Sequence, residues 1–542
     1  MSCKKVDQKI IIGIALVVYL IMAVLYVGRV YPFDILPDEF GYWQNVALIR
    51  GLDWKQVSAL GDYYSYGYSF ILLPIHLLAS SPLAAYRIAV VFNLIMLFIA
   101  GIVLMKITDV NPCFCLIYPP LVYYALTTMS EAFLFIIFTL ALLVLKRYLR
   151  SRNTTDGVLL IVLLVFLFTI HMRTLPLLVV ALLLLRDKDG EDKSGKKRFI
   201  GLIILTMIIF VLALYAGLIF QKPIIAANGS ARTGFYAVLK SFGSLYSLNS
   251  LKRFLLAVIG EVFYIGAASL GLAYIGLVRI IRKVREKQDF EYFYLVSLLC
   301  EMALSALFLY MSESSLSVIY GRYIDFMVPG LMLYGVREVE ENGFKIRQFL
   351  ILMAAMAITA LLVIPDLIKF GRVESLFALG INYFLVEETS PVVMIAIACL
   401  SGCVGLVGML AAGALRESKD KATMIFGVFS AFFIAFAYYI GGDMVNSNMS
   451  YSKENVELAD RLKDTGDDKI FYIYSEEQPA VQILQFMLPE KPIEIIKTVD
   501  EITGYDIMSE NYIVVPAYDI INNQLSDKYE LYDETRTFKV WK

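Results

Sequence analysis

The sequence predicts a mainly α-helical, polytopic transmembrane protein with a small α/β domain at its C-terminal end. Hydrophobic residues make up 59% of the 542 residues and charged residues only 18%, whereas soluble chains have roughly 45–50% apolar and about 25% charged residues. Apolar runs long enough to cross about 30 Å of hydrocarbon recur along the chain. From about residue 445 the chain becomes polar and alternates β-type and helical patterns. A helical bundle of about thirteen spans followed by a small mixed domain is therefore expected.

The expected spans follow the apolar runs in order, and the first run is too long for the apolar part of a signal peptide. They are residues 10–30, 83–105, 113–127, 131–146, 156–171, 174–186, 198–220, 254–281, 289–311, 323–337, 348–364, 391–415 and 422–441. One further apolar stretch, 67–80, is shorter and contains Pro74 and His76.

Basic clusters decide how this short stretch lies, because Lys and Arg gather in cytoplasmic loops. Such clusters stand at 4–9, 146–152, 186–198, 279–287, 337–347 and 416–421. If 67–80 lies in the outer interface instead of crossing, all of them fall on the cytoplasmic side. We therefore expect a juxtamembrane helix there, a cytoplasmic N-terminus and a cell-membrane location. The outer segments are then 31–82, 128–130, 172–173, 221–253, 312–322, 365–390 and everything after 441.

The chain is expected to divide into a transmembrane module, 1–443, and an extracytoplasmic α/β domain, 444–542. The second part contains the β-type runs "KIFYIYS", "NYIVVPAY" and "RTFKVWK", with a helical pattern in "EEQPAVQILQFML" and a further helix near 499–503. Strands that alternate with helices over this length are typical of a small α/β domain.

The first outer segment, 31–82, begins with an acidic pair in "ILPDEFGYWQNVALIRG". Asp38 is a candidate N-cap for a helix over 39–50 that ends at Gly51. An acidic pair at a helix N-terminus can be purely structural, but a carboxylate beside hydrocarbon is costly and often functional. Adjacent helical residues point about 100° apart. We therefore expect one of Asp38 and Glu39 to be a base or ligand and the other a supporting residue.

Aromatic residues dominate the rest of this segment. Phe40, Trp43 and Ala47 share one face of the expected helix and are suited to lie against the bilayer. The stretch "GDYYSYGYSF" (61–70) suits either an interfacial tyrosine belt or a sugar-binding wall, because rings stack on sugars and hydroxyls pair with sugar oxygens. The candidate sugar- or acceptor-binding residues here are Asp62, Tyr63, Tyr64 and Tyr66.

Further charged residues stand at the outer ends of spans. Glu131 in "TTMSEAF" is either a helix-capping glutamate or part of a cavity, and is a further candidate sugar- or acceptor-binding residue. Arg173 in "HMRT" and Arg322–Tyr323 in "YGRYIDF" are candidates to bind an anionic head group, since the arginine fork suits phosphate. The structural alternatives are a snorkelling Arg173 and an ion pair between Arg322 and Asp325. Together these residues suit a lipid-phosphate ligand.

Several classes of partner and chemistry are disfavoured. The net charge of −1 argues against a nucleic-acid partner. The chain has no Gly-rich phosphate loop, which argues against a nucleotide-sugar donor handled by the common cytoplasmic metal site. A divalent metal stays open, with Asp38, Glu39, Glu131 and His76 as the available ligands.

These motifs, in this order and with this sidedness, resemble the glycosyltransferase C superfamily, in particular the branch of protein O-mannosyltransferases and lipid A aminoarabinose transferases. The acidic pair follows the first span, the proline-containing 67–80 comes next, and "LTTMSEAFLFIIFTLALLVLKRYLR" resembles the acidic residue that enters a span of this family. "TIHMRTLPLLVVALLLL" resembles its Arg-Pro turn, although Thr174 and Leu175 separate Arg173 from Pro176.

The resemblance implies a cell-envelope enzyme that transfers a sugar, with inversion, from a polyprenyl-phosphate donor to a hydroxyl of a glycan, lipid or protein acceptor. The lack of retention or sorting signals favours a bacterial origin. The resemblance also implies that Asp38 is the general base, with Glu39 beside it. Arg322, Arg173 and Tyr323 would then bind the donor phosphate. Some relatives carry a divalent metal.

Two other functions stay open from the sequence. A lipid or polysaccharide transporter or flippase would use charged residues within the bilayer, for which Glu261, Glu301 and Asp325 are candidates. A lipid-linked polysaccharide polymerase or ligase would rely on a large outer loop, for which 221–253 is the candidate.

Overall fold

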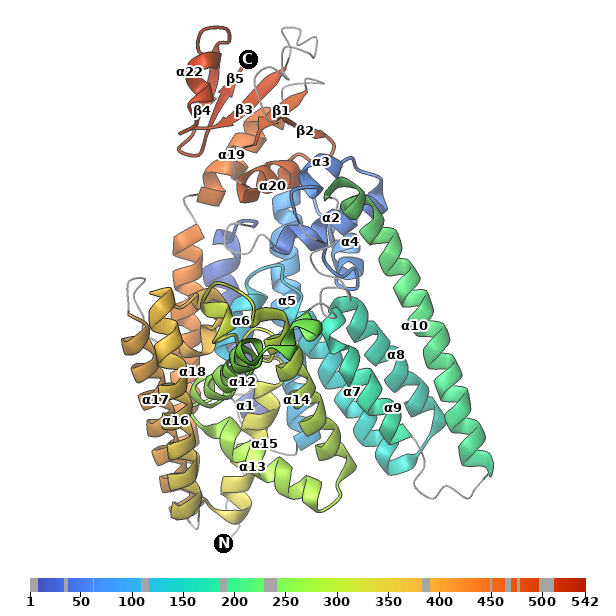
Figure 1. Cartoon of the computed structure of the whole chain (residues 1–542), viewed down its shortest axis with the longest axis vertical. Coiled ribbons are helices and arrows are strands. Elements are labelled where there is room, and N and C mark those ends of the chain that lie inside the picture. The colour runs from blue at the N-terminus through green and yellow to red at the C-terminus, as the bar shows by residue number, and fades with distance from the viewer. Residues whose placement is uncertain are drawn as a thin grey trace.

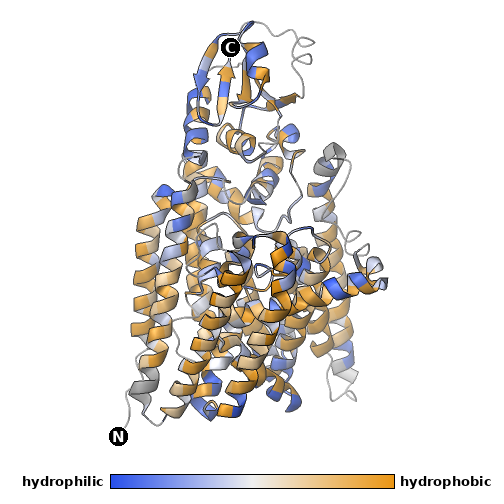
Figure 2. Cartoon of the chain, turned by 60° about the vertical axis from the view of Figure 1, so that its left-hand side comes forward, coloured by the Kyte–Doolittle hydropathy of each residue, from blue (hydrophilic) through white to orange (hydrophobic). Residues whose placement is uncertain are grey.

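A computed structural model describes most of the chain. The described residues are 8–33, 38–61, 63–108, 117–185, 193–228, 241–382, 390–416, 418–448, 451–463, 469–474, 478–496 and 511–542. Figure 1 shows a bundle of helices with a small sheet at one end, beside the C-terminus. In Figure 2 the bundle helices are largely hydrophobic, whereas the C-terminal part is mixed. The predicted polytopic helical fold with a small C-terminal α/β part is confirmed.

Eight helices of the described chain are long and apolar enough to cross a membrane. Large apolar side chains such as Leu20, Val211 and Leu361 are exposed on them, as expected for surfaces that face lipid. The eight helices are α1 (Gln8–Tyr26), α5 (Pro82–Thr108), α7 (Glu131–Ser151), α10 (Lys193–Asn228), α14 (Asp289–Leu309), α16 (Ile346–Phe370), α17 (Pro391–Ala414) and α18 (Lys419–Asn448).

The remaining expected spans differ from straight, full-length helices. Instead of one straight helix, range 254–281 forms two, α12 (Leu248–Ala268) and α13 (Leu272–Arg285). The chain bends by 112° between them. Gly271 at the bend has φ +81°, a conformation that favours glycine. This pair raises the number of possible spans in the described chain to nine, against the thirteen expected.

Four expected spans are shorter helices inside the bundle. Helices α8 (Thr154–Ile170) and α9 (Leu175–Leu185) are apolar but short, and α6 (Pro119–Ala125) and α15 (Val328–Asn342) fill only part of 113–127 and 323–337. All seven residues of α6 are buried. Non-helical backbone is tolerated at membrane depth where protein surrounds it, so apolar composition alone overestimated the helix lengths.

Residues 31–82 form short helices where the structure describes them, as predicted. Helix α2 spans Asp38–Arg50 and ends at Gly51, whose φ is +74°. Helix α3 spans Lys55–Ser58, and α4 (Ser69–Leu78) contains Pro74 and is too short to cross a bilayer.

Short 3₁₀ turns connect several of the described helices. They are η1 (Val27–Arg29), η2 (Met172–Thr174), η3 (Ser244–Tyr246), η4 (Ser315–Ser317), η5 (Ser375–Phe377) and η6 (Leu379–Ile381).

The described residues of the C-terminal part contain a five-stranded mixed sheet of order β2-β1-β3-β5-β4. The three predicted strands are confirmed as β1 (Ile470–Ile473), β3 (Tyr512–Pro516) and β5 (Phe538–Trp541), whereas β2 (Ile493–Ile496) and β4 (Leu531–Glu534) were not predicted. Strand β1 pairs in parallel with β2 and β3, and β5 runs antiparallel to β3 and β4. The helices are α19 (Tyr451–Lys463), the predicted α20 (Gln478–Met487) and α22 (Ile521–Leu525). The helix expected near 499–503 lies outside the described residues.

Helix α20 packs on residues 31–82. The Phe486 ring lies 5.0 Å from both the Phe33 and Trp43 rings, centroid to centroid. Phe40 stacks on Trp54 at 5.5 Å. Phe40, Trp43 and Ala47 are almost completely buried, so the expectation that they face the bilayer is wrong. The C-terminal part covers the apolar face of α2 instead, which fixes the helix that begins at Asp38.

Candidate functional site

The centre of the candidate site is an arginine between two carboxylates. Arg322 Nη1 donates to Asp38 Oδ2 at 2.8 Å, and Arg322 Nε donates to Glu131 Oε1 at 2.6 Å. The Arg322 and Glu131 side chains are buried, whereas the Asp38 side chain is 28% exposed. Asp38 and Glu131 are the first residues of α2 and α7, and Arg322 lies in the turn before α15. Asp38 is thus the member of this trio that solvent or a substrate reaches.

Asp38 has a second partner in the tyrosine-rich stretch. The Tyr64 hydroxyl donates to Asp38 Oδ1 at 2.5 Å. Burial and the nearby Asp38 carboxylate raise the pKa of Tyr64 well above its usual range, so it stays a donor. A Cβ at Gly41 would lie 2.0 Å from the Tyr64 ring, so only glycine at this position admits the ring. Both oxygens of Asp38 are therefore oriented, although Asp38 begins the helix instead of preceding it as an N-cap.

Glu39 lies in a different, closed environment. Its Oε2 accepts hydrogen bonds from the Thr128 backbone N–H (2.5 Å), the Thr128 hydroxyl (2.7 Å) and the Tyr86 hydroxyl (2.8 Å). Burial raises the pKa of Glu39 to about 7, although these three donors oppose the shift. The two neighbours point to separate partners, as the helix geometry predicted. Glu39 fastens α2 to α5 and to the segment that precedes α7.

Arg173 borders the same region from the turn between α8 and α9. Its guanidinium carbon lies 4.2 Å from the centroid of the Tyr323 ring, and its Nε lies 4.0 Å from a Glu301 carboxylate oxygen. Arg173 is 4% exposed, yet none of its three guanidinium nitrogens makes a hydrogen bond within the described chain. Tyr323 follows Arg322 directly, so the two arginines flank one tyrosine. Arg173 has unused hydrogen-bonding capacity, whereas Arg322 is largely occupied by carboxylates.

The tyrosines of 61–70 do not form one continuous open wall. The Tyr66 ring stacks on Phe220 of α10 at 5.0 Å, and its hydroxyl donates to the Ala213 carbonyl at 2.8 Å. Tyr63 is buried in the same cluster. Helix α10 covers these rings, which a sequence pattern cannot reveal. Among the described residues of this stretch, Tyr64 is the tyrosine that reaches Asp38, while Asp62 lies outside the described residues.

The candidate metal ligands do not converge. No group of three or more His, Cys, Asp or Glu side chains that could hold a metal occurs in the part of the chain that the structure describes. Arg322 lies between Asp38 and Glu131, and Glu39 points to Thr128. His76 Nδ1 lies 3.0 Å from Arg50 Nη1. Burial and then the Arg50 charge lower the pKa of His76.

Sequence reasoning missed several partners of these residues. Tyr118 and Tyr264 donate to Asp325 Oδ1 at 2.9 and 2.8 Å, so Asp325 is bound by tyrosines instead of Arg322. Thr128, Tyr86 and Glu301 were likewise not predicted as partners of Glu39 and Arg173. The sequence signals such partners only as polar residues in otherwise apolar stretches. This pattern does not indicate which polar side chains contact one another.

The fold is similar to that of a protein of known structure. ArnT from Cupriavidus metallidurans in the apo state superposes with a TM-score of 0.55 at 13% identity, over 98% of this chain and 97% of that chain. ArnT from the same organism bound to undecaprenyl phosphate gives a TM-score of 0.54 at 14% identity over the same shares. No protein-family model and no curated protein sequence matches the chain. The likeness expected from the sequence is thus confirmed at the level of the fold by these two ArnT structures.

Proposed function

We propose that the protein is an integral membrane glycosyltransferase that transfers a sugar from a polyprenyl-phosphate donor to an acceptor hydroxyl. The observation that carries the proposal is the partly exposed Asp38 held by Arg322 and Tyr64 at the start of α2. A solved structure with the same fold along nearly its whole length is described as bound to undecaprenyl phosphate. A carboxylate oriented beside cationic groups matches the needs of such a transfer.

In the proposed reaction Asp38 acts as general base. The acceptor hydroxyl gives its proton to an Asp38 oxygen while its own oxygen bonds to the anomeric carbon of the sugar. The bond between that carbon and the phosphate oxygen breaks on the opposite face, and the polyprenyl phosphate leaves with the electron pair. One displacement inverts the anomeric configuration and needs no protein nucleophile. Arg322 and Tyr64 orient the Asp38 carboxylate, and Glu131 fixes Arg322.

Arg173 is the stronger candidate for binding the leaving phosphate. Its guanidinium nitrogens make no hydrogen bond within the described chain, and Tyr323 supports its planar face. Arg322 has two of its nitrogens committed to carboxylates, so it would contribute mainly its charge. The fork of an arginine matches two phosphate oxygens, and a cation in a water-poor site stabilises the charge that develops there.

The proposal places the site on the outer face of the cell membrane, with the N-terminus in the cytoplasm and 444–542 outside. The basic clusters of the sequence support this orientation. Helix α18 (Lys419–Asn448) runs through residues 443 and 444, so it would carry the chain directly from the membrane module to the outer part. The acceptor, a glycan, lipid or protein, is expected to approach Asp38 from that side.

The experiment is a transfer assay with the purified full-length protein in lipid. A panel of polyprenyl-phosphate hexoses and pentoses is offered with candidate acceptors, and mass spectrometry detects the glycosylated product. We expect one donor to be used and the product to have the opposite anomeric configuration, measured by NMR. A product with retained configuration would contradict the single displacement. Movement of labelled lipid across liposomes without any acceptor, and no transfer, would favour a flippase instead.

A further inference from the structure

A second, basic cavity lies at the opposite end of the bundle from Asp38. It has a volume of about 610 Å³, within the range of roughly 300–1,000 Å³ that is usual for ligand sites. Helix α7 begins at Glu131 of the candidate site, and Lys146 and Arg150 of this cavity lie 15 and 19 residues further on. At 1.5 Å per residue this places the cavity about 22–28 Å away along the helix, close to the thickness of the hydrocarbon core.

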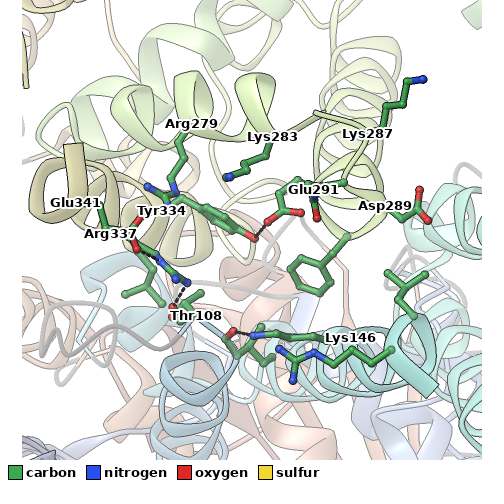
Figure 3. A pocket seen from close by; sticks show the side chains of 16 residues that line it. Thr108, Lys146, Arg279, Lys283, Lys287, Asp289, Glu291, Tyr334, Arg337 and Glu341 are labelled. Carbon is green, nitrogen blue, oxygen red and sulfur yellow. Dashed lines mark hydrogen bonds and ion pairs between the residues drawn. The ribbon is translucent and has the colours of Figure 1, made fainter. Parts of the chain in front are cut away.

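Cations outnumber carboxylates around this cavity. Among the described residues, six basic and three acidic side chains line it. Figure 3 shows Lys146 on one side and Arg279, Lys283 and Arg337 on the other. Apolar side chains, among them Leu149, Phe290 and Leu333, also line the cavity. The basic residues are Lys146, Arg150, Arg279, Lys283, Lys287 and Arg337, and the acidic ones are Asp289, Glu291 and Glu341.

Three of the basic side chains make structural hydrogen bonds with the helices around the cavity. Arg337 donates to the Thr108 carbonyl at 2.9 Å, and the Lys146 ammonium donates to the Ile107 carbonyl, so both cap the C-terminal end of α5. Arg279 is 4% exposed and donates to Glu338 and Glu341, at 3.0 and 2.6 Å. Its Nε is buried and makes no hydrogen bond within the described residues.

The acidic side chains of the lining have partners of their own. Glu341 is held by Arg279 and Arg337, the Glu291 carboxylate accepts from the Tyr334 hydroxyl at 3.1 Å, and Asp289 lies 3.6 Å from Arg152. The remaining cations are less engaged. Lys283 pairs only with the exposed Glu286, and Arg150 and Lys287 make no ion pair within the described chain. The cavity thus keeps an uncompensated positive charge beside apolar side chains.

We propose that this cavity binds the phosphate head group of an anionic lipid, on the membrane face opposite the transfer site. Basic pockets between transmembrane helices attract such head groups. The apolar lining suits the first carbon atoms of the lipid. The positive-inside rule accounts for basic residues at this level, but it does not require them to surround a cavity. The proposal is independent of the chemistry assigned to Asp38.

The test compares two triple variants of the full-length protein in mild detergent. Arg150→Gln, Lys283→Gln and Lys287→Gln remove the three less engaged cations of the cavity. Lys196→Gln, Lys197→Gln and Arg347→Gln remove three basic residues that lie outside its lining. The thermal unfolding midpoint is measured while phosphatidylglycerol, phosphatidylcholine or glycerol 3-phosphate is added.

We expect phosphatidylglycerol to raise the thermal unfolding midpoint of the wild type and of the triple variant outside the cavity lining. Phosphatidylcholine should have little effect on either protein. Each cation near a membrane surface is worth a factor of about five in affinity, so the cavity variant should need roughly a hundredfold more phosphatidylglycerol. An equal response of both triple variants would overturn the proposal. So would a response to glycerol 3-phosphate as large as that to the lipid, because the ligand would then be a soluble phosphate.

Discussion

At the scale of residues, the site depends on buried charges that compensate one another. Arg322 and Glu131 are buried and 2.6 Å apart. A buried ion pair contributes little net stability, but removal of one partner leaves a charge that is expensive to bury. The exposed pair between Arg50 and Glu490, 3.0 Å apart, provides a natural comparison, since exposed pairs are worth about 0–1 kcal/mol.

We predict that Glu131→Gln lowers the free energy of unfolding by about 3 kcal/mol, the usual cost of breaking a buried pair. It should also lower transfer activity, because Glu131 fixes the arginine that holds Asp38. Glu490→Gln should change stability by less than about 1 kcal/mol. Both are measured by chemical unfolding in detergent. Equal effects of the two variants would show that the Glu131–Arg322 contact is not a structural ion pair.

The second residue-scale prediction concerns pH and Glu39. Burial raises the pKa of Glu39 to about 7 from a usual value of 4.5. Because the folded state keeps the proton longer than the unfolded state, stability is greatest below pH 4.5 and falls as the pH rises toward 7. The difference corresponds to roughly 3 kcal/mol. Glu39→Gln should remove this slope, measured as the unfolding midpoint from pH 4.5 to 8. Parallel profiles of the two proteins would contradict the assignment.

At the scale of elements, close helix packing holds the turn that carries Arg322. Helices α13 and α15 approach through Gly276 and Gly335, where added Cβ atoms would lie 1.9 Å from the Leu331 carbonyl oxygen and 2.2 Å from the Leu272 carbonyl oxygen. Small residues allow such contact between membrane helices.

Gly276→Ala should therefore separate α13 from α15 and lower the free energy of unfolding by about 1–3 kcal/mol. Gly201→Ala in α10 is the matched control, since an added Cβ there meets no atom within 4 Å. The measurement is the unfolding midpoint of both variants in detergent. A loss of stability in Gly201→Ala as large as that in Gly276→Ala would argue against the steric explanation.

The contact between α20 and α2 is the second prediction at this scale. Phe486 is fully buried against the rings of Phe33 and Trp43. Phe486→Ala should cost about 3–5 kcal/mol, as expected for a large buried ring, and should reduce transfer because α2 begins with Asp38. Ile520→Ala removes a side chain that is 80% exposed and should have little effect. An unfolding series together with the transfer assay distinguishes the two, and full activity of Phe486→Ala would contradict the proposed coupling.

At the scale of the whole molecule, apolar runs predicted the membrane bundle well but not its breaks. Length and composition identify α5, α7 and α14, because their lipid-facing sides must be apolar. They do not reveal the bend between α12 and α13, which depends on tertiary packing around Gly271. Likewise an apolar helix face suits lipid or protein equally, so the covering of α2 by α20 was not predictable.

The same limit applies to the candidate site. The order and sidedness of Asp38, Glu131 and Arg322 indicated one region, and the structure brings these three side chains into direct contact. The ion pair considered from the sequence joined Arg322 to Asp325, whereas Arg322 pairs with Asp38 and Glu131. The sequence also did not indicate that Arg173 makes no hydrogen bond in the described chain. Which charged side chains form ion pairs depends on the distances between helices that are far apart in the sequence. A local sequence pattern contains no information about those distances.

The most direct test of the account is single-turnover sugar transfer by Asp38→Asn in the full-length protein. Asn keeps the shape of the side chain but cannot accept the proton, and a general base contributes a factor of about 10²–10⁴. We predict a rate at least a hundredfold lower, with donor binding changed little. Asp53→Asn, at an exposed carboxylate of the same outer segment, should transfer at the wild-type rate. An undiminished rate in Asp38→Asn would contradict the assignment of Asp38 as the base.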